Sequence, residues 1–111
     1  MKLKKNTGNS NNYKISISEE AIEDLNDVLF WYELHSKQLS KEFYKNLRYG
    51  FKKILSNPQS YQKVYNNVRR CLMKKFPFSI IYRLDEVNME IVIISIFHNS
   101  RNPKILKERA N

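Results

Sequence analysis

The stretch MEIVIISIF, residues 89–97, is nearly all apolar and is dominated by β-branched residues. Such a run is typical of a strand inside a sheet that is covered on both faces. The preceding stretch FSIIYRL, residues 78–84, alternates, which places Arg83 on the face opposite to Tyr82. Turn-forming residues at 85–88 join the two stretches. The sequence therefore predicts an antiparallel hairpin in the sheet.

Upstream of this hairpin, helical spacing replaces alternation. Ser18 is a suitable N-cap for the first helix, and Pro58 lies just beyond the end of the second. Because the link between the two helices is short, they are expected to pack antiparallel. The other predicted elements, in chain order, are a strand at 13–18, a helix from Ser18 to about His35–Ser36, a helix from Leu39 or Ser40 to Ser56, strands at 61–65 and 68–76 with a turn at Asn66–Asn67, and a short helix at 103–109.

This order of elements predicts an α+β fold. We expect an N-terminal strand, an antiparallel helical hairpin packed on a three- to four-stranded, mainly antiparallel sheet, and a short C-terminal helix. The polar residues 1–12 are expected to form a flexible tail, and residues 13–109 a single domain.

Composition limits the classes of function. The net charge of +9 favours anionic partners such as nucleic acid, ribosomes or acidic proteins. The chain has one cysteine and no apolar run long enough for a membrane span, so a cytoplasmic protein that does not bind membranes is expected. Neither a zinc-ligand spacing nor a phosphate-binding glycine loop occurs, so no metal and no cofactor are predicted.

The charges are unevenly distributed along the chain. Residues 13–36 contain one basic and six acidic residues, whereas residues 37–84 contain twelve basic residues and one acidic residue. Within the second helix, four cations recur at spacings of four, three and four and form one ridge: Lys41, Lys45, Arg48 and Lys52. The outer face of the first helix is expected to be marked by acidic residues: Glu20, Asp24 and Asp27. The basic ridge could pair with this acidic face, or it could bind a partner.

Four stretches in this order resemble the toxins of the RelE/ParE superfamily: LFWYELHS, ILSNPQSY, VRRCLMKKFPFSIIYRL and IVIISIFHNSRNP. The resemblance covers residues 13–103 and is nearer to the ParE-like, plasmid-stabilisation branch. It implies a type II toxin that arrests growth unless a cognate antitoxin neutralises it through an acidic or amphipathic C-terminal segment.

Two targets are compatible with this resemblance. ParE-like members inhibit DNA gyrase without being nucleases, and this is the preferred interpretation. RelE-like members are ribosome-dependent mRNA endoribonucleases, but here no tyrosine follows Tyr82 as it does in those nucleases. A nucleic-acid-binding module without catalytic activity is a further alternative, so whether the protein is an enzyme stays open at this point.

If the protein is a nuclease, its chemistry needs a general base and cations for the phosphate. His98 would be the base, and Arg83 and Arg101 would bind phosphate oxygens. His98 could instead only fix the exit of its strand through a hydrogen bond. Four further cations are candidates for binding the target or nucleic acid: Arg69, Arg70, Lys74 and Lys75. Since neighbouring strand residues point to opposite faces, one member of each pair is expected at a given surface.

Overall fold

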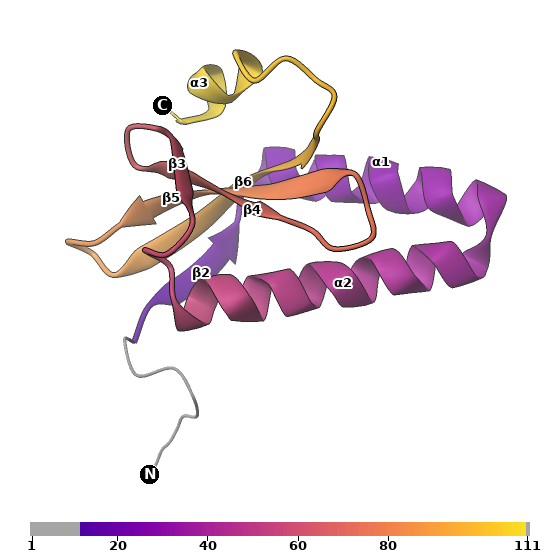
Figure 1. The fold of residues 1–111 in the computed structure, drawn as a ribbon, viewed down its shortest axis with the longest axis horizontal. Coiled ribbons are helices and arrows are strands. Elements are labelled where there is room, and N and C mark those ends of the chain that lie inside the picture. Colours follow the sequence, from indigo (N-terminus) through magenta and orange to yellow (C-terminus); the bar gives the residue numbers. More distant parts are fainter. Residues whose placement is uncertain (1–11, 111) are drawn as a thin grey trace, which may run out of the picture.

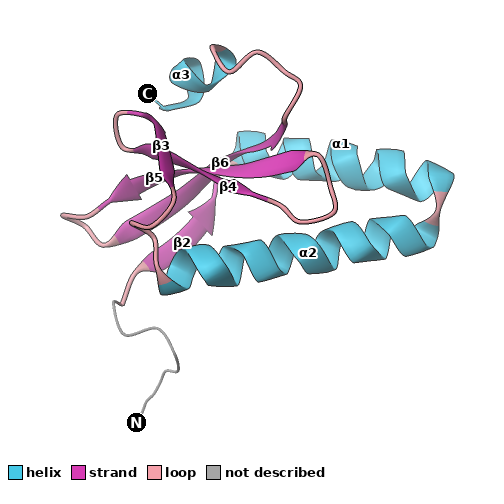
Figure 2. Cartoon of the chain, in the orientation of Figure 1, coloured by secondary structure: helices cyan, strands magenta, loops and turns pink. Residues whose placement is uncertain are grey.

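The computed structural model describes residues 12–110, so nearly all of the expected flexible tail, residues 1–12, lies outside the described part. Figures 1 and 2 show two long helices beside a twisted sheet, with a short helix near the C-terminus. No described helix is both long and apolar enough to cross a membrane. The elements are β2 (Lys14–Ile17), α1 (Glu19–His35), α2 (Lys37–Ser56), β3 (Gln62–Tyr65), β4 (Val68–Leu72), β5 (Phe78–Asp85), β6 (Glu90–His98) and α3 (Ile105–Ala110).

The sheet has five strands in the order β2-β6-β5-β4-β3. The predicted hairpin is present as β5 and β6, and β3, β4, β5 and β6 form an antiparallel succession. The prediction of three to four strands was one short, because the N-terminal strand also joins the sheet. β2 pairs in parallel with the first half of β6, from Lys14 opposite Glu90 to Ile17 opposite Ile93. The α+β class is confirmed, with a mixed sheet.

Two serines set the helix boundaries. The Ser18 side chain accepts a hydrogen bond from the backbone N–H of Ala21, 3.1 Å away, and caps α1 as predicted. Ser36 ends α1 and begins α2, since its backbone N–H donates to Tyr32 while its side chain accepts from Leu39. This shared cap makes α2 begin at Lys37, two to three residues before the predicted start, and leaves a very short link between the helices.

Both faces of the sheet are covered, as the MEIVIISIF stretch predicted. The helical hairpin packs on the first face, where Ile91, Ile93 and Ile96 of β6 lie in the larger core cluster. The helix α3 packs on the second face, where Ile94 and Phe97 contact its leucine, Leu106, in a smaller cluster. The two sides of the sheet therefore differ in how much of each is covered.

One irregularity in β6 changes the direction of its side chains. Ile81 of β5 lies opposite Ser95, but the next residue, Tyr82, lies opposite Ile93, so Ile94 is an extra residue. A bulge of this kind reverses the alternation along a strand. Residues after the bulge therefore point to the face opposite to the one that simple alternation predicts, and this decides where the end of β6 presents its side chains.

Candidate functional site

The open end of the second sheet face carries a network of polar side chains. The Arg70 guanidinium donates to the Ser79 hydroxyl and to the Asn99 side-chain oxygen, each at 3.0 Å, and the Ser79 hydroxyl donates to the same oxygen at 2.6 Å. Leu72 lies on the same face of β4 and is 60% exposed. We call Arg70, Leu72, Ser79 and Asn99 the open-face patch; it offers a cation held in place beside an exposed apolar side chain.

Arg69 points to the opposite face from Arg70 and has a structural role. Its guanidinium donates to the backbone carbonyls of Gln59 and Tyr61, at 3.0 and 2.8 Å. Beside it, the buried Tyr82 hydroxyl donates to the carbonyl of Pro58 at 2.6 Å, and burial raises the pKa of this phenol. These bonds hold the segment that follows α2 against the sheet.

His98 lies on the helical side of the sheet because of the bulge in β6. Its ring packs edge-on against Phe78, with centroids 4.9 Å apart, and its Nδ1 accepts from the Ser100 backbone N–H at 3.1 Å. Arg83 points to the second face, since it lies opposite Val68 and Val92, which belong to the smaller cluster. The structure therefore does not bring His98 and Arg83 together.

The remaining predicted site residues, Arg101, Lys74 and Lys75, are exposed and do not belong to the open-face patch. Arg101 lies in the turn after β6, where its backbone N–H donates to the His98 carbonyl at 3.0 Å, and its side chain lines a hollow beside α3. Lys74 and Lys75 lie in the loop between β4 and β5, and Lys75 adopts a left-handed backbone conformation with φ of 70°. Of the seven residues singled out, Arg70 alone takes part in the open-face patch.

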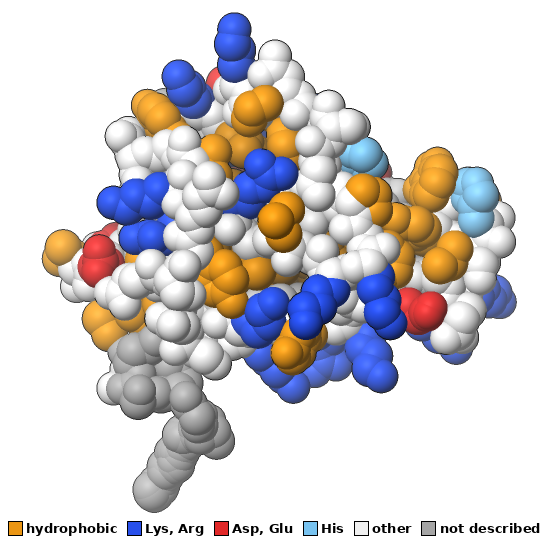
Figure 3. All heavy atoms as spheres, in the orientation of Figure 1, with side chains coloured by type: hydrophobic (Ala, Val, Ile, Leu, Met, Phe, Trp, Pro, Cys, Tyr) orange, Lys and Arg blue, Asp and Glu red, His pale blue; other side chains and the backbone are white. Residues whose placement is uncertain are grey.

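A second candidate surface is apolar and lies at the end of α1. Phe30, Trp31 and Leu34 are 65%, 55% and 69% exposed, and we call them the α1 apolar patch. Figure 3 shows apolar side chains beside the histidines in this region. Next to the patch is a pocket of about 340 Å³, lined by Asp27, Val28, Trp31, Tyr32, Pro77, Phe78 and His98. Exposed apolar surface beside a pocket is typical of a site where another protein binds.

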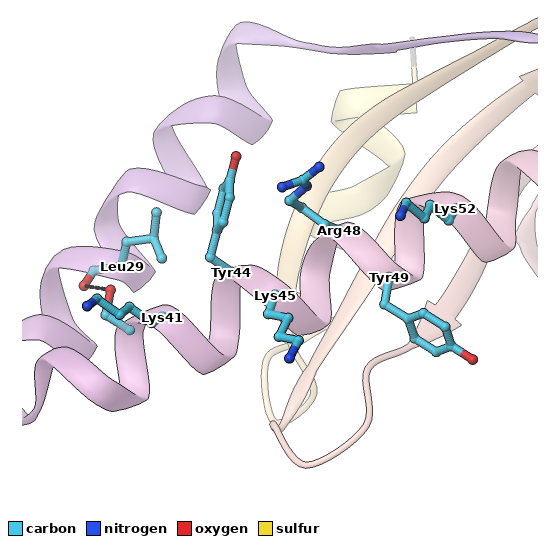
Figure 4. A pocket seen from close by; sticks show the side chains of 8 residues that line it. Leu29, Lys41, Tyr44, Lys45, Arg48, Tyr49 and Lys52 are labelled. Atoms are coloured by element: carbon cyan, nitrogen blue, oxygen red, sulfur yellow. Dashed lines mark hydrogen bonds between the residues drawn. The ribbon is translucent and has the colours of Figure 1, made fainter.

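A third surface is the basic ridge of α2, whose four side chains are all exposed. They line a shallow hollow of about 590 Å³ together with Leu29, Ser40, Tyr44 and Tyr49 (Figure 4). Within residues 12–110 no ion pair joins this ridge to the acidic residues of α1. Pairing between the two helices, one of the two interpretations of the ridge, is therefore not what the structure shows.

The acidic face of α1 instead contacts the C-terminal helix. Asp24 and Arg109 form an ion pair at 2.5 Å and are only 16% and 17% exposed. Asp24 also accepts from the Ser95 hydroxyl and from the Ile96 backbone N–H, each at 3.1 Å. Hydrogen bonding to Asp24 raises the pKa of Arg109, which stays cationic. The expectation that Asp24 marks an outer face was wrong, because α1 runs along the part of the β6 edge that β2 leaves free.

The comparisons with known proteins concern the family and the fold. The model of a family described as the ParE toxin of the type II toxin–antitoxin system parDE matches residues 15–103. None of the curated proteins matches the chain.

Two solved structures have similar folds. One, of the chromosomal ParDE TA system from P. aeruginosa, has a TM-score of 0.69 at 17% identity and covers 80% of this chain and 98% of that one. The other, the isolated E. coli RelE toxin, has a TM-score of 0.55 at 11% identity and covers 86% and 94%.

Proposed function

The chain belongs to the ParE toxins of type II toxin–antitoxin systems, and on this premise we propose that it arrests growth by inhibiting DNA gyrase when its antitoxin is absent. One observation supports a protein target over RNA cleavage: His98 and Arg83 point to opposite faces of the sheet. A general base and a phosphate-binding cation must lie within hydrogen-bond reach of one substrate. Side chains separated by a sheet do not meet this condition.

The open-face patch is the proposed contact with the target. Arginine and large apolar side chains provide most of the binding energy at protein interfaces when water is excluded around them. Leu72 is exposed, and the Arg70 guanidinium is already held by Ser79 and Asn99, so little side-chain freedom is lost on binding. The patch thus combines an apolar anchor with a preorganised cation.

Replacement of Leu72 with glutamate tests this site. Leu72→Glu is expected to weaken inhibition of gyrase supercoiling about 30-fold, because it removes an apolar anchor and buries a charge in the interface. Val87→Glu is a matched control, since Val87 is also exposed but lies in the β5–β6 turn, and it should inhibit like the wild type. Truncated transcripts in a translating extract, together with unchanged supercoiling, would instead identify the RelE-like ribonuclease activity.

The α1 apolar patch is the proposed contact with the antitoxin. Toxins of this family act with a cognate antitoxin, and we propose that an acidic, amphipathic segment of it covers Phe30, Trp31 and Leu34. An amphipathic helix binds by placing apolar side chains in such a surface. The net charge of +9 on the toxin would attract its acidic face.

Trp31 allows a direct measurement of antitoxin binding, because it is the sole tryptophan of the chain and is half exposed. Binding of the cognate segment is expected to shift Trp31 fluorescence to shorter wavelength as water leaves the indole ring. Leu34→Glu should weaken binding about 30-fold, whereas Val87→Glu should not change it. Tight binding that leaves the fluorescence of Trp31 unchanged would place the antitoxin on another surface.

A further inference from the structure

We propose that the basic ridge of α2 binds the phosphate backbone of double-helical DNA. The ridge consists of Lys41, Lys45, Arg48 and Lys52, all exposed and all on one stripe of a helix 20 residues long. At 1.5 Å per residue the row is about 16 Å long. Its cations follow one another at about 4.5–6 Å along the helix axis. B-DNA carries one negative charge per about 1.7 Å of its axis when both strands are counted. Four cations held this close together on one side of a rigid helix therefore suit a dense and regular array of negative charges.

The ridge has no evident role in stabilising the fold. Within residues 12–110 none of its four cations forms an ion pair. Lys41 with Lys45, and Arg48 with Lys52, are like-charge pairs four residues apart on α2. Such pairs repel one another and destabilise a helix. A helix that places four cations on one stripe is therefore better explained by an anionic partner than by its own stability.

The geometry favours DNA over an acidic protein. Protein interfaces are apolar at the centre and polar at the rim, whereas here the cations are central and Tyr44 and Tyr49 lie on the two flanks, as Figure 4 shows. Single-stranded nucleic acid needs aromatic rings in succession along the strand, and these two tyrosines do not form such a row. The wide major groove of B-DNA admits a helix, while the narrow one of A-form RNA does not.

The proposal concerns direct binding by the toxin and does not depend on inhibition of gyrase. It is tested by fluorescence anisotropy with a labelled duplex of about 20 base pairs, without gyrase or antitoxin. Between about 50 and 200 mM salt, the affinity of the wild-type protein should fall about 100-fold, because four phosphate contacts release about four counterions. A variant with glutamine at all four ridge positions should lose this salt dependence and bind at least about 100-fold more weakly at low salt.

The control removes four positive charges from other exposed positions and keeps the same net charge as the ridge variant. It carries Lys14→Gln, Lys63→Gln, Lys104→Gln and Lys107→Gln. Circular dichroism and Trp31 fluorescence should show that both variants are folded. The affinity of the control for DNA should lie within about threefold of the wild-type affinity. The proposal is overturned if the ridge variant and the control lose the same amount of DNA affinity. It is also overturned if the wild-type protein binds an RNA duplex with the same affinity as the DNA duplex, or binds polyglutamate as tightly as DNA.

Discussion

Asp24→Ala is expected to lower the free energy of unfolding by about 3 kcal/mol, because it leaves a largely buried guanidinium without its counterion. Three groups share this carboxylate: the Arg109 guanidinium, the Ser95 hydroxyl and the Ile96 backbone N–H. Loss of one acceptor therefore leaves several donors unsatisfied at once, which costs more than the loss of one ordinary hydrogen bond.

Urea unfolding of Asp24→Ala and Asp27→Ala measures this effect. Asp27 lies on the same helix but is exposed, so its replacement should change stability by less than about 0.5 kcal/mol. The Asp24→Ala, Arg109→Ala double variant should be less destabilised than the sum of the single variants, since its partner charge is also gone. A cost for Asp24→Ala no larger than that for Asp27→Ala would show that this ion pair does not hold α3.

The functional consequence concerns the second face of the sheet. Arg109 also donates to the Ile94 carbonyl at 3.1 Å, so the ion pair connects α3 to β6 and α1 together. Leu106 of α3 covers Ile94 and Phe97. When Asp24 is lost, α3 should detach before the rest of the domain unfolds, and hydrogen exchange should increase first at α3.

Phe43→Ala is expected to cost about 4 kcal/mol, the largest effect of a single substitution among those described. The Phe43 side chain of α2 is fully buried against α1, β5 and the β4–β5 loop. Its ring lies 5.2–5.4 Å from the rings of Tyr32, Phe76 and Phe78, with an edge-to-face geometry toward both phenylalanines. Truncation removes these contacts and leaves a cavity that the rigid hairpin cannot close.

The neighbouring aromatic residue is the matched control. Tyr44 is exposed, and Tyr44→Ala should cost less than about 1 kcal/mol, mainly through lost surface contacts. Both variants are compared by thermal and urea unfolding. Since domains of this size are stabilised by about 5–15 kcal/mol, Phe43→Ala should also reduce the amount of folded toxin in cells. Similar costs for the two variants would mean that the aromatic cluster adds little to the stability of the hairpin.

Most of the fold follows from local patterns in the sequence. The alternation in FSIIYRL correctly separated Tyr82 from Arg83, and the apolar run of β6 correctly predicted a strand covered on both faces. In a strand, successive side chains point to opposite faces of the sheet, so the burial of each face is visible as a period of two residues in the local sequence. The partner of an N-terminal strand is a long-range choice, so the parallel pairing of β2 with β6 could not be read in this way.

The candidate site was less predictable because it depends on a single extra residue. Without the bulge at Ile94, His98 would point to the same face as Arg83. No glycine lies at this bulge, so nothing in the local sequence indicates it. Asp24 was predicted on the outer face of α1 for a related reason. Helical spacing within α1 cannot show that Arg109 of α3, much later in the sequence, packs against Asp24. The exposure of Phe30, Trp31 and Leu34 likewise depends on which side of α1 packs against α2 and the sheet.

The pairing of β2 with β6 has a consequence for synthesis of the toxin. β2 begins at Lys14, and each of its partner residues, 90–93, is made 76 residues after the β2 residue with which it pairs. Contacts between segments this far apart in sequence form slowly, and here they cannot form until residues 90–93 have left the ribosome. A nascent chain therefore lacks the finished sheet on which the open-face patch depends, and a newly made toxin becomes competent to act only after an interval in which the antitoxin can already be present.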